Sequence, residues 1–478
     1  MSEDFSDDQF QFSYLNKYWF VFGLVFLLLG FFFSLSANLF SNDNWFVHGI
    51  FCILSTFFIC AQSCLIFKQP KIIIILDLRW MLMVSFWLYY IFGASMLYFG
   101  SDKQIELAMG YYYVDLNLVL MANSMNSIGF GFMIILISLF NIHWPAKIVN
   151  TFYKNHIFFS RSDFILFIPL FLSLFSLILS LLNLSGIIKI TSFYGLILFL
   201  KEIGLSYFII LIYYKGPNKK IIYFFVLLYS ALYLYGGLIF LNKADIFLPI
   251  MIFSISFLFK RKFMKFTIIF MIMILSLIIF QNYVSELRST RNYNHQFKVD
   301  VFKKNILTKE NKNSASLWDR LNYLNTQGAV INFYDNKDKT ENLKLAIWLF
   351  VPRIFYEQKP NINLFSKNLY RKITNHGGSS DTPGIFIEGY YNYGWFGLFL
   401  TSFLAASIIM IYKTMIYYIV QKKIFTLYFV ITTGFYTSFR IDGLILNDYL
   451  GRFIYVILLT IIMMFILQLA KLIFNKNI

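Results

Sequence analysis

The stretch YWFVFGLVFLLLGFFFSLSANLF, residues 18–40, decides the fold class because it carries no charged side chain over its whole length. As an α-helix it is long enough to cross the ~30 Å hydrocarbon core of a membrane. Similar apolar runs recur along the 478-residue chain, whose mean hydropathy is +0.65. Only 14% of the residues are charged, against about 25% in soluble domains. The runs are continuous rather than alternating, so we predict an all-α polytopic membrane protein and not a β-barrel.

The apolar runs predict about twelve transmembrane helices. Their ranges are 18–40, 45–67, 79–99, 117–140, 163–184, 191–214, 221–241, 245–259, 264–283, 393–412, 424–439 and 450–471. The predicted organisation is therefore helices 1 to 9 within residues 1–283, one large loop over 284–392, and helices 10 to 12 within 393–478. The three cysteines fall in a single apolar run, which indicates small buried side chains rather than a disulfide framework.

The short loops on one side of the predicted bundle are rich in lysine and arginine, for example at Lys219, Lys220, Lys422 and Lys423. Positively charged loops are retained in the cytoplasm, so this bias places both termini in the cytoplasm and the 284–392 loop outside. The same retention explains much of the net charge of +17, and we expect no nucleic-acid partner. The cytoplasmic loops are too short to hold a nucleotide-binding fold.

The 284–392 loop contains one apolar segment, near 343–356, that is too short to span the membrane. We expect an interfacial or re-entrant helix there, ended by Pro352. The following stretch, VPRIFYEQKP (351–360), gathers Arg353 and Lys359 between prolines in a chain that otherwise avoids charge. Its composition suggests a site for an anionic group.

Further cations lie near the outer ends of predicted spans. They are Arg288 and Arg291 in ELRSTRNY (286–293), Lys243 in LNKADIF (241–247), and Arg440 and Arg452 in SFRIDGLILNDYLGRF (438–453). The planar guanidinium forms bidentate hydrogen bonds with phosphate, and it stays charged when desolvated. We therefore predict that these residues converge on a diphosphate at the outer boundary. The alternative is that each arginine reaches to the interface and contacts ordinary lipid phosphate.

Candidate acid–base groups lie at the end of the same loop. Glu388 stands just before a predicted span, where burial raises a carboxyl pKa and suits it to act as a base. His376 is a second candidate, and Tyr390, Tyr391 and Asn392 are candidates to bind sugar. The alternatives are a salt bridge for Glu388, a solvated loop histidine, and an interfacial aromatic belt for the tyrosines. No metal-ligand spacing is present, so we expect neither a metal nor another cofactor.

The motifs VPRIFYEQKP and TPGIFIEGYYNYGWFG (382–397), within this predicted topology, resemble the O-antigen polymerase family of bacterial membranes. The resemblance rests on Pro352, Arg353, Lys359, Pro360, Glu388, Asn392, Gly394 and Gly397, and on the arginines of ELRSTRNY. The segment LNKADIF is similar to a further family motif but lacks its glycine, which weakens the assignment of Lys243.

The resemblance implies a GT-C-like glycosyltransferase in the bacterial inner membrane, with its active site facing the periplasm. The donor would be a glycan on undecaprenyl diphosphate, and the acceptor a repeat unit on the same lipid. The arginines would bind the diphosphate, and Glu388 or His376 would take the proton of the attacking hydroxyl. Besides these lipid-linked oligosaccharides and the bilayer, implied partners are a chain-length regulator and a flippase.

Two other functions fit the same sequence. An O-antigen ligase uses the same donor, and His376 with the outer arginines suits it equally well. A lipid-linked oligosaccharide flippase also has about twelve spans, although it carries its charges inside the bundle and usually lacks a long outer loop. A scaffold role fits least, because clustering desolvated arginines is costly without a ligand.

Overall fold

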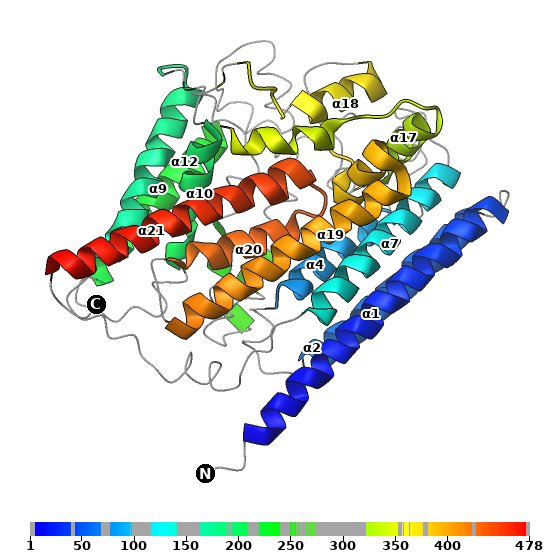
Figure 1. The fold of residues 1–478 in the computed structure, drawn as a ribbon, viewed down its shortest axis with the longest axis horizontal. Helices are drawn as coiled ribbons and strands as arrows, with labels where there is room; N and C mark the ends of the chain where they lie inside the picture. Colours follow the sequence, from blue (N-terminus) through cyan, green and yellow to red (C-terminus); the bar gives the residue numbers. More distant parts are fainter. Residues whose placement is uncertain are drawn as a thin grey trace, which may run out of the picture. The chain divides into compact units, whose positions relative to one another are not determined.

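The fold is given by a computed structural model. It describes residues 5–39, 44–67, 77–95, 97, 116–140, 163–188, 190, 194–208, 219–239, 322–351, 356, 358–362, 364–375, 381–422 and 427–474, with isolated positions between 249 and 272. All regular secondary structure in these residues is helical (Figure 1). Seven of the helices are long and apolar enough to cross a membrane. The prediction of a helical multi-pass membrane protein is thereby confirmed.

The seven long apolar helices coincide with predicted spans. They are α1 (Phe5–Leu39), α2 (Asn44–Phe67), α7 (Leu116–Leu139), α9 (Asp163–Leu184), α12 (Lys219–Ile239), α19 (Gly384–Lys422) and α21 (Arg452–Phe474). Three other predicted spans contain shorter helices, namely α4 (Leu78–Phe86) with the π-helical η1 (Trp87–Phe92), α10 (Tyr194–Ile203) with the 3-10 turn η2 (Gly204–Ser206), and α20 (Phe429–Phe439). The predicted spans 245–259 and 264–283 lie outside the described residues, apart from isolated positions.

The chain forms two compact units. The first comprises Met1–Phe152, Trp318–Gln421 and Thr433–Ile457, and the second comprises Tyr153–Leu317, Lys422–Thr432 and Leu458–Ile478. In the first unit, α1 runs alongside α7 (Figure 1). A methyl group on Gly131 would lie 2.5 Å from the Leu27 nitrogen, and one on Gly30 would lie 2.7 Å from the Ser124 carbonyl oxygen. Small residues at these crossings let the two backbones touch, which is a common way to pack membrane helices.

Helix α4 holds the end of α20 in place. The Ser85 hydroxyl donates to the Phe439 carbonyl at 2.6 Å, and the Tyr90 hydroxyl donates to the Ile441 carbonyl at 2.8 Å. Beneath these contacts, the ring of Phe86 stacks on Phe130 of α7 with centroids 4.2 Å apart. The turn that follows α20 is therefore fixed against a packed core.

Helix α19 is broken at Tyr393 and Gly394, where Gly394 has φ 63° and ψ −146°. A methyl group on Gly389 would lie 2.3 Å from the Gly397 carbonyl oxygen. In a continuous helix, residues eight apart are separated by about 12 Å along the axis, so the chain must turn back at the break. The first segment is consequently a short helix buried in the first unit, and the long helix begins at Trp395, close to the predicted start at 393.

Three elements of the predicted outer loop pack around this short helix: α17 (Leu324–Asp335), the 3-10 helix η3 (Asn342–Phe350) and α18 (Leu364–Thr374). On α17, buried Gln327 accepts from the Asn126 amide at 2.6 Å and donates to the Pro383 carbonyl at 2.7 Å. Helix η3 ends two residues before Pro352, inside the predicted 343–356 segment, and exposes Ile347 and Phe350.

The second unit contains a buried lysine. The Lys201 ammonium on α10 lies 4.6 Å from the ring centroid of Tyr233 on α12, and the Tyr229 hydroxyl donates to the Lys201 carbonyl. Gly204 packs against Ser173 of α9 and Tyr229 of α12, so the three helices meet at this point.

Candidate functional site

The turn between α20 and the π-helical η5 (Ile445–Gly451) carries a cluster of charges. The Arg440 Nε lies 3.3 Å from Asp442 Oδ1, and its Nη2 lies 3.7 Å from Asp448 Oδ1. Asp448 Oδ2 also accepts from the Leu444 backbone nitrogen at 3.0 Å, which closes the turn. A methyl group on Gly443 would lie 2.3 Å from this oxygen, so a larger residue there would displace the Asp448 side chain.

The Tyr436 side chain brings two of the predicted arginines together. The Arg452 guanidinium carbon lies 4.0 Å from the ring centroid, and that of Arg440 lies 6.0 Å from it. Arg440 Nη1 also donates to the Tyr436 hydroxyl at 3.3 Å. Two of the predicted cations, from different helix ends, therefore lie against the same ring, and their binding of a diphosphate stays a prediction.

Asp442 is the most enclosed member of the cluster, with a side chain only 6% exposed. Its carboxylate has Tyr323 as a hydrogen-bond partner, and the Thr382 hydroxyl donates to its backbone carbonyl at 2.8 Å. Burial raises the pKa of Asp442 above its ordinary value; the nearby Asp448 charge adds to this, while Arg440 and the Tyr323 hydrogen bond oppose it. A carboxyl group with a raised pKa beside an arginine is a feature of acid–base sites.

Glu388 is completely buried in the short segment of α19. Its Oε1 accepts from the Asn342 amide at 2.7 Å, and its Oε2 accepts from the Ile445 backbone nitrogen at 2.7 Å. Asn392 reinforces the arrangement, since it donates to the Glu388 carbonyl at 2.8 Å and accepts from the Leu343 nitrogen at 2.9 Å. The Glu388 carboxylate thus joins η3 and η5 to α19, and both of its oxygens are engaged.

The predicted sugar-binding tyrosines are covered by the loop helices. Tyr390 packs against Tyr334 with ring centroids 4.6 Å apart, and its hydroxyl donates to Asp335 at 3.2 Å. The Tyr391 hydroxyl accepts from Lys372 at 3.0 Å. Both tyrosines and Asn392 are buried, and their binding of sugar stays a prediction.

Of the remaining predicted residues, the structure describes Lys359. Lys359 is half-buried, and its Nζ donates to the Val351 carbonyl at 2.8 Å. The other predicted residues lie outside the described residues: Lys243, Arg288, Arg291, Arg353 and His376. No cluster of three or more potential metal ligands occurs in the part of the chain that the structure describes.

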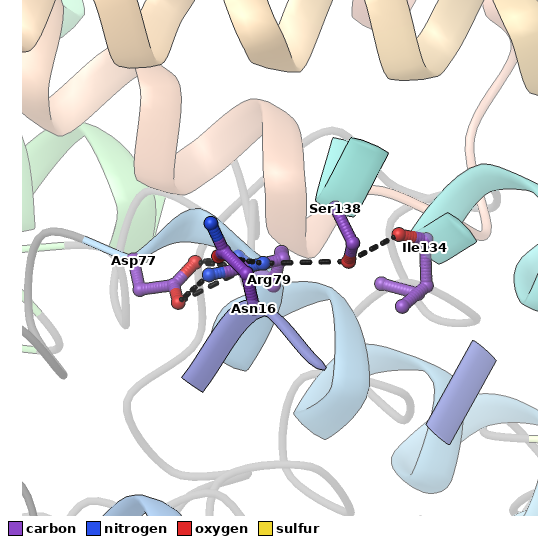
Figure 2. A network of polar contacts seen from close by, with 5 residues as sticks. All are labelled: Asn16, Asp77, Arg79, Ile134 and Ser138. Atoms are coloured by element: carbon purple, nitrogen blue, oxygen red, sulfur yellow. Dashed lines mark hydrogen bonds and ion pairs between the residues drawn. The ribbon is translucent and has the colours of Figure 1, made fainter. Parts of the chain in front are cut away.

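A second charged network, which the sequence reasoning missed, lies at the start of α4 (Figure 2). Arg79 forms an ion pair with Asp77 at 2.7 Å, and its Nη1 donates to Asn16 at 3.0 Å and to Ser138 at 3.3 Å. Its guanidinium lies 5.0 Å from the Trp19 ring centroid. Burial acts to raise the pKa of Asp77, but Arg79 and the charge of Lys413 hold it below its ordinary value. The available signal was Asp-x-Arg directly before an apolar run.

Comparison of the chain with protein-family models, with curated proteins and with solved structures finds no match. The fold and the site together define a multi-pass helical membrane protein with a partly buried cluster of arginines and aspartates at the turn between α20 and η5.

Proposed function

We propose that the chain is a glycosyltransferase that polymerises lipid-linked oligosaccharide repeat units. It would transfer a glycan from undecaprenyl diphosphate to the non-reducing end of another lipid-linked repeat unit. The observation that supports this best is the meeting of Arg440 and Arg452 on Tyr436, beside Asp442 and Asp448. It combines groups suited to hold an anion with groups suited to accept a proton.

Diphosphate is already a good leaving group, so the main task of the site is to stabilise negative charge on departing phosphate oxygens. Fixed guanidinium groups in a partly dry site do this without reorganisation. The two arginines and two aspartates of the turn balance one another in charge. A diphosphate therefore needs additional cations, and we propose Arg288, Arg291, Arg353, Lys359 and Lys243 for this role.

The predicted base is Glu388, with His376 as the second candidate. Because both Glu388 oxygens accept hydrogen bonds, this residue has to release Asn342 or the Ile445 nitrogen before it accepts a substrate proton. In the same proposal, Tyr390, Tyr391 and Asn392 contact sugar after the loop helices move.

The proposal includes about twelve spans with a GT-C-like arrangement in a bacterial inner membrane. Both termini would be cytoplasmic and the site would face the periplasm. A flippase would supply the substrate, and a chain-length regulator would act on the product. The O-antigen ligase reaction uses the same donor and stays the first alternative.

One observation favours the flippase as a further candidate. Arg79, Lys201 and Lys413 are cations buried inside apolar helices, which is where a transporter for an anionic lipid carries charge. In the first unit, Arg79 is already paired with Asp77, so this observation supports transport less strongly than the turn supports transfer.

The glycan profile of a deletion strain separates the three functions. Loss of a polymerase leaves surface glycans one repeat long, loss of a ligase leaves none attached, and loss of a flippase strands the units inside. The strain is complemented with wild-type protein, with Arg452→Gln, and with Lys344→Gln as a control, because Lys344 forms an exposed ion pair with Glu341. We expect Arg452→Gln alone to reproduce the one-repeat profile at a normal protein level.

Long glycans in the deletion strain would contradict the proposal. So would a normal chain length for Arg452→Gln in combination with Arg440→Gln.

A further inference from the structure

Two atoms at the centre of the charged turn lack hydrogen bonds. Asp442 Oδ1 and Arg440 Nε are both buried, and neither makes a hydrogen bond within the described part of the chain. They lie 3.3 Å apart, as an ion pair without hydrogen-bond geometry. Buried polar atoms are almost always satisfied, so such a pair needs an explanation.

An acceptor and a donor that both lack a hydrogen bond match a hydroxyl group, which donates one hydrogen bond and accepts others. Both atoms are enclosed and form an ion pair with each other, so the turn has to open before a sugar hydroxyl reaches them. We propose that Asp442 Oδ1 and Arg440 Nε bind the attacking hydroxyl of the acceptor sugar, and that Asp442 is the catalytic base. This inference rests on the proposed function and assigns to Asp442 the role predicted for Glu388. Glu388 differs from Asp442 because both oxygens of its carboxylate accept hydrogen bonds, whereas Asp442 Oδ1 has only the ion pair with Arg440.

In the proposed step, the acceptor hydroxyl oxygen attacks the anomeric carbon of the donor. A new carbon–oxygen bond forms while the bond from that carbon to the diphosphate oxygen breaks. The bonding electron pair leaves with the diphosphate, and the hydroxyl proton passes to Asp442 Oδ1. Arg440 Nε donates to the attacking oxygen and keeps its lone pair directed at the anomeric carbon.

The groups around Asp442 tune its affinity for that proton. Burial and the Asp448 charge raise the pKa of Asp442, while Arg440 and the Tyr323 hydrogen bond lower it. Tyr89, Tyr90 and Tyr449 also lie within electrostatic range of the carboxylate. The carboxylate therefore retains a basicity that an aspartate paired closely with arginine alone would lose.

The test uses full-length protein purified in detergent, with lipid-linked repeat units extracted from the deletion strain as donor and acceptor. Chain elongation is measured for wild type, Asp442→Asn, Glu388→Gln and Lys344→Gln, and donor binding is measured separately. General-base catalysis contributes 100-fold or more, so we expect elongation by Asp442→Asn to fall at least ~100-fold while donor binding changes less than about twofold. Lys344→Gln breaks an exposed ion pair with Glu341 and leaves the turn intact, so it should retain elongation.

Elongation by Asp442→Asn within about tenfold of wild type overturns the inference, and so does a parallel loss of donor binding. If Glu388→Gln abolishes elongation at a normal protein level while Asp442→Asn retains it, the inference is overturned as well. Should Asp442→Asn not be recovered from membranes, Tyr323→Phe replaces it. This variant removes the hydrogen bond that lowers the Asp442 pKa, so its rate–pH curve should move to higher pH, and an unchanged curve also overturns the inference.

Failure of the proposed function gives a different result from failure of the Asp442 assignment. In that case wild-type protein does not elongate the extracted units, and the deletion strain shows no one-repeat glycan. Failure of the Asp442 assignment alone leaves wild-type elongation and the one-repeat phenotype intact.

Discussion

Replacing Arg79 with methionine tests whether the buried network of Figure 2 is needed for stability. Arg79 Nε donates to Asp77 Oδ1 at 2.8 Å, its Nη2 donates to Asp77 Oδ2 at 2.7 Å, and its Nη1 contacts Asn16 and Ser138. The substitution leaves the Asp77 carboxylate buried without its ion-pair partner, at a cost of ~3–5 kcal/mol. Because the Lys413 charge also favours ionised Asp77, we expect the lower end of that range.

The assay is unfolding of the purified protein in detergent, followed by tryptophan fluorescence. Two further variants interpret the result. Asp77→Asn in combination with Arg79→Met removes both charges, and it should recover much of the lost free energy of unfolding, since replacing a whole buried pair is often nearly neutral. Lys344→Met breaks an exposed pair with Glu341 and should cost at most about 1 kcal/mol. A loss below about 1 kcal/mol for Arg79→Met, or no recovery in the double variant, would refute the reasoning.

Three other outcomes are expected. Gly397→Ala should lower the free energy of unfolding by ~1–3 kcal/mol or more in a thermal unfolding assay, because the added methyl lies 1.9 Å from the Gly389 carbonyl oxygen. Gly434→Ala adds ordinary contacts and should be tolerated in the same assay. The depressed pKa of Asp77 contributes stability that is fully present above the unfolded pKa near 3.8 and is lost as the pH falls through the folded pKa. The difference in free energy of unfolding between wild type and Asp77→Asn should therefore shrink below about pH 4 in an unfolding series. Lys372→Met removes a partly exposed pair with Asp338, so it should cost at most about 1 kcal/mol overall while it speeds proteolysis of the loop helices.

The helical membrane fold was predictable from the sequence because hydrophobic length is a local property. The run at 18–40 matches α1, and the predicted start of a span at 393 matches the break at Gly394. What local polarity did not reveal is the short helical segment before that break. The charged Glu388 indicated a loop. The structure buries this side chain, which accepts hydrogen bonds from Asn342 and Ile445, 46 and 57 residues away in the sequence.

The two charged networks show the same limit of local reasoning. Arg79 and Lys413 stand at the ends of predicted spans, where the sequence suggests cytoplasmic loop cations. Both are nevertheless buried in the first unit. Arg440 and Arg452 were predicted as site residues from their position at span ends, and both guanidinium groups lie against Tyr436. Tyr436 and Tyr323 contact the cluster but are uncharged. Only tertiary contacts therefore identify them as part of it.

The charge balance of the turn distinguishes two roles that the sequence suggested for one site: binding the diphosphate and activating the acceptor hydroxyl. A site meant only to bind diphosphate gains affinity from unpaired cations, and two aspartates against the same guanidinium would weaken it. Nucleophile activation has the opposite requirement, because the arginine must orient an oxygen and leave a carboxylate able to take a proton. Asp448 accepts from the Leu444 nitrogen and shares Arg440, whereas Asp442 Oδ1 has the ion pair with Arg440 and no hydrogen bond in the described part of the chain. The turn is therefore better suited to the acceptor hydroxyl than to the leaving group, and the loop cations are the better candidates to bind the diphosphate.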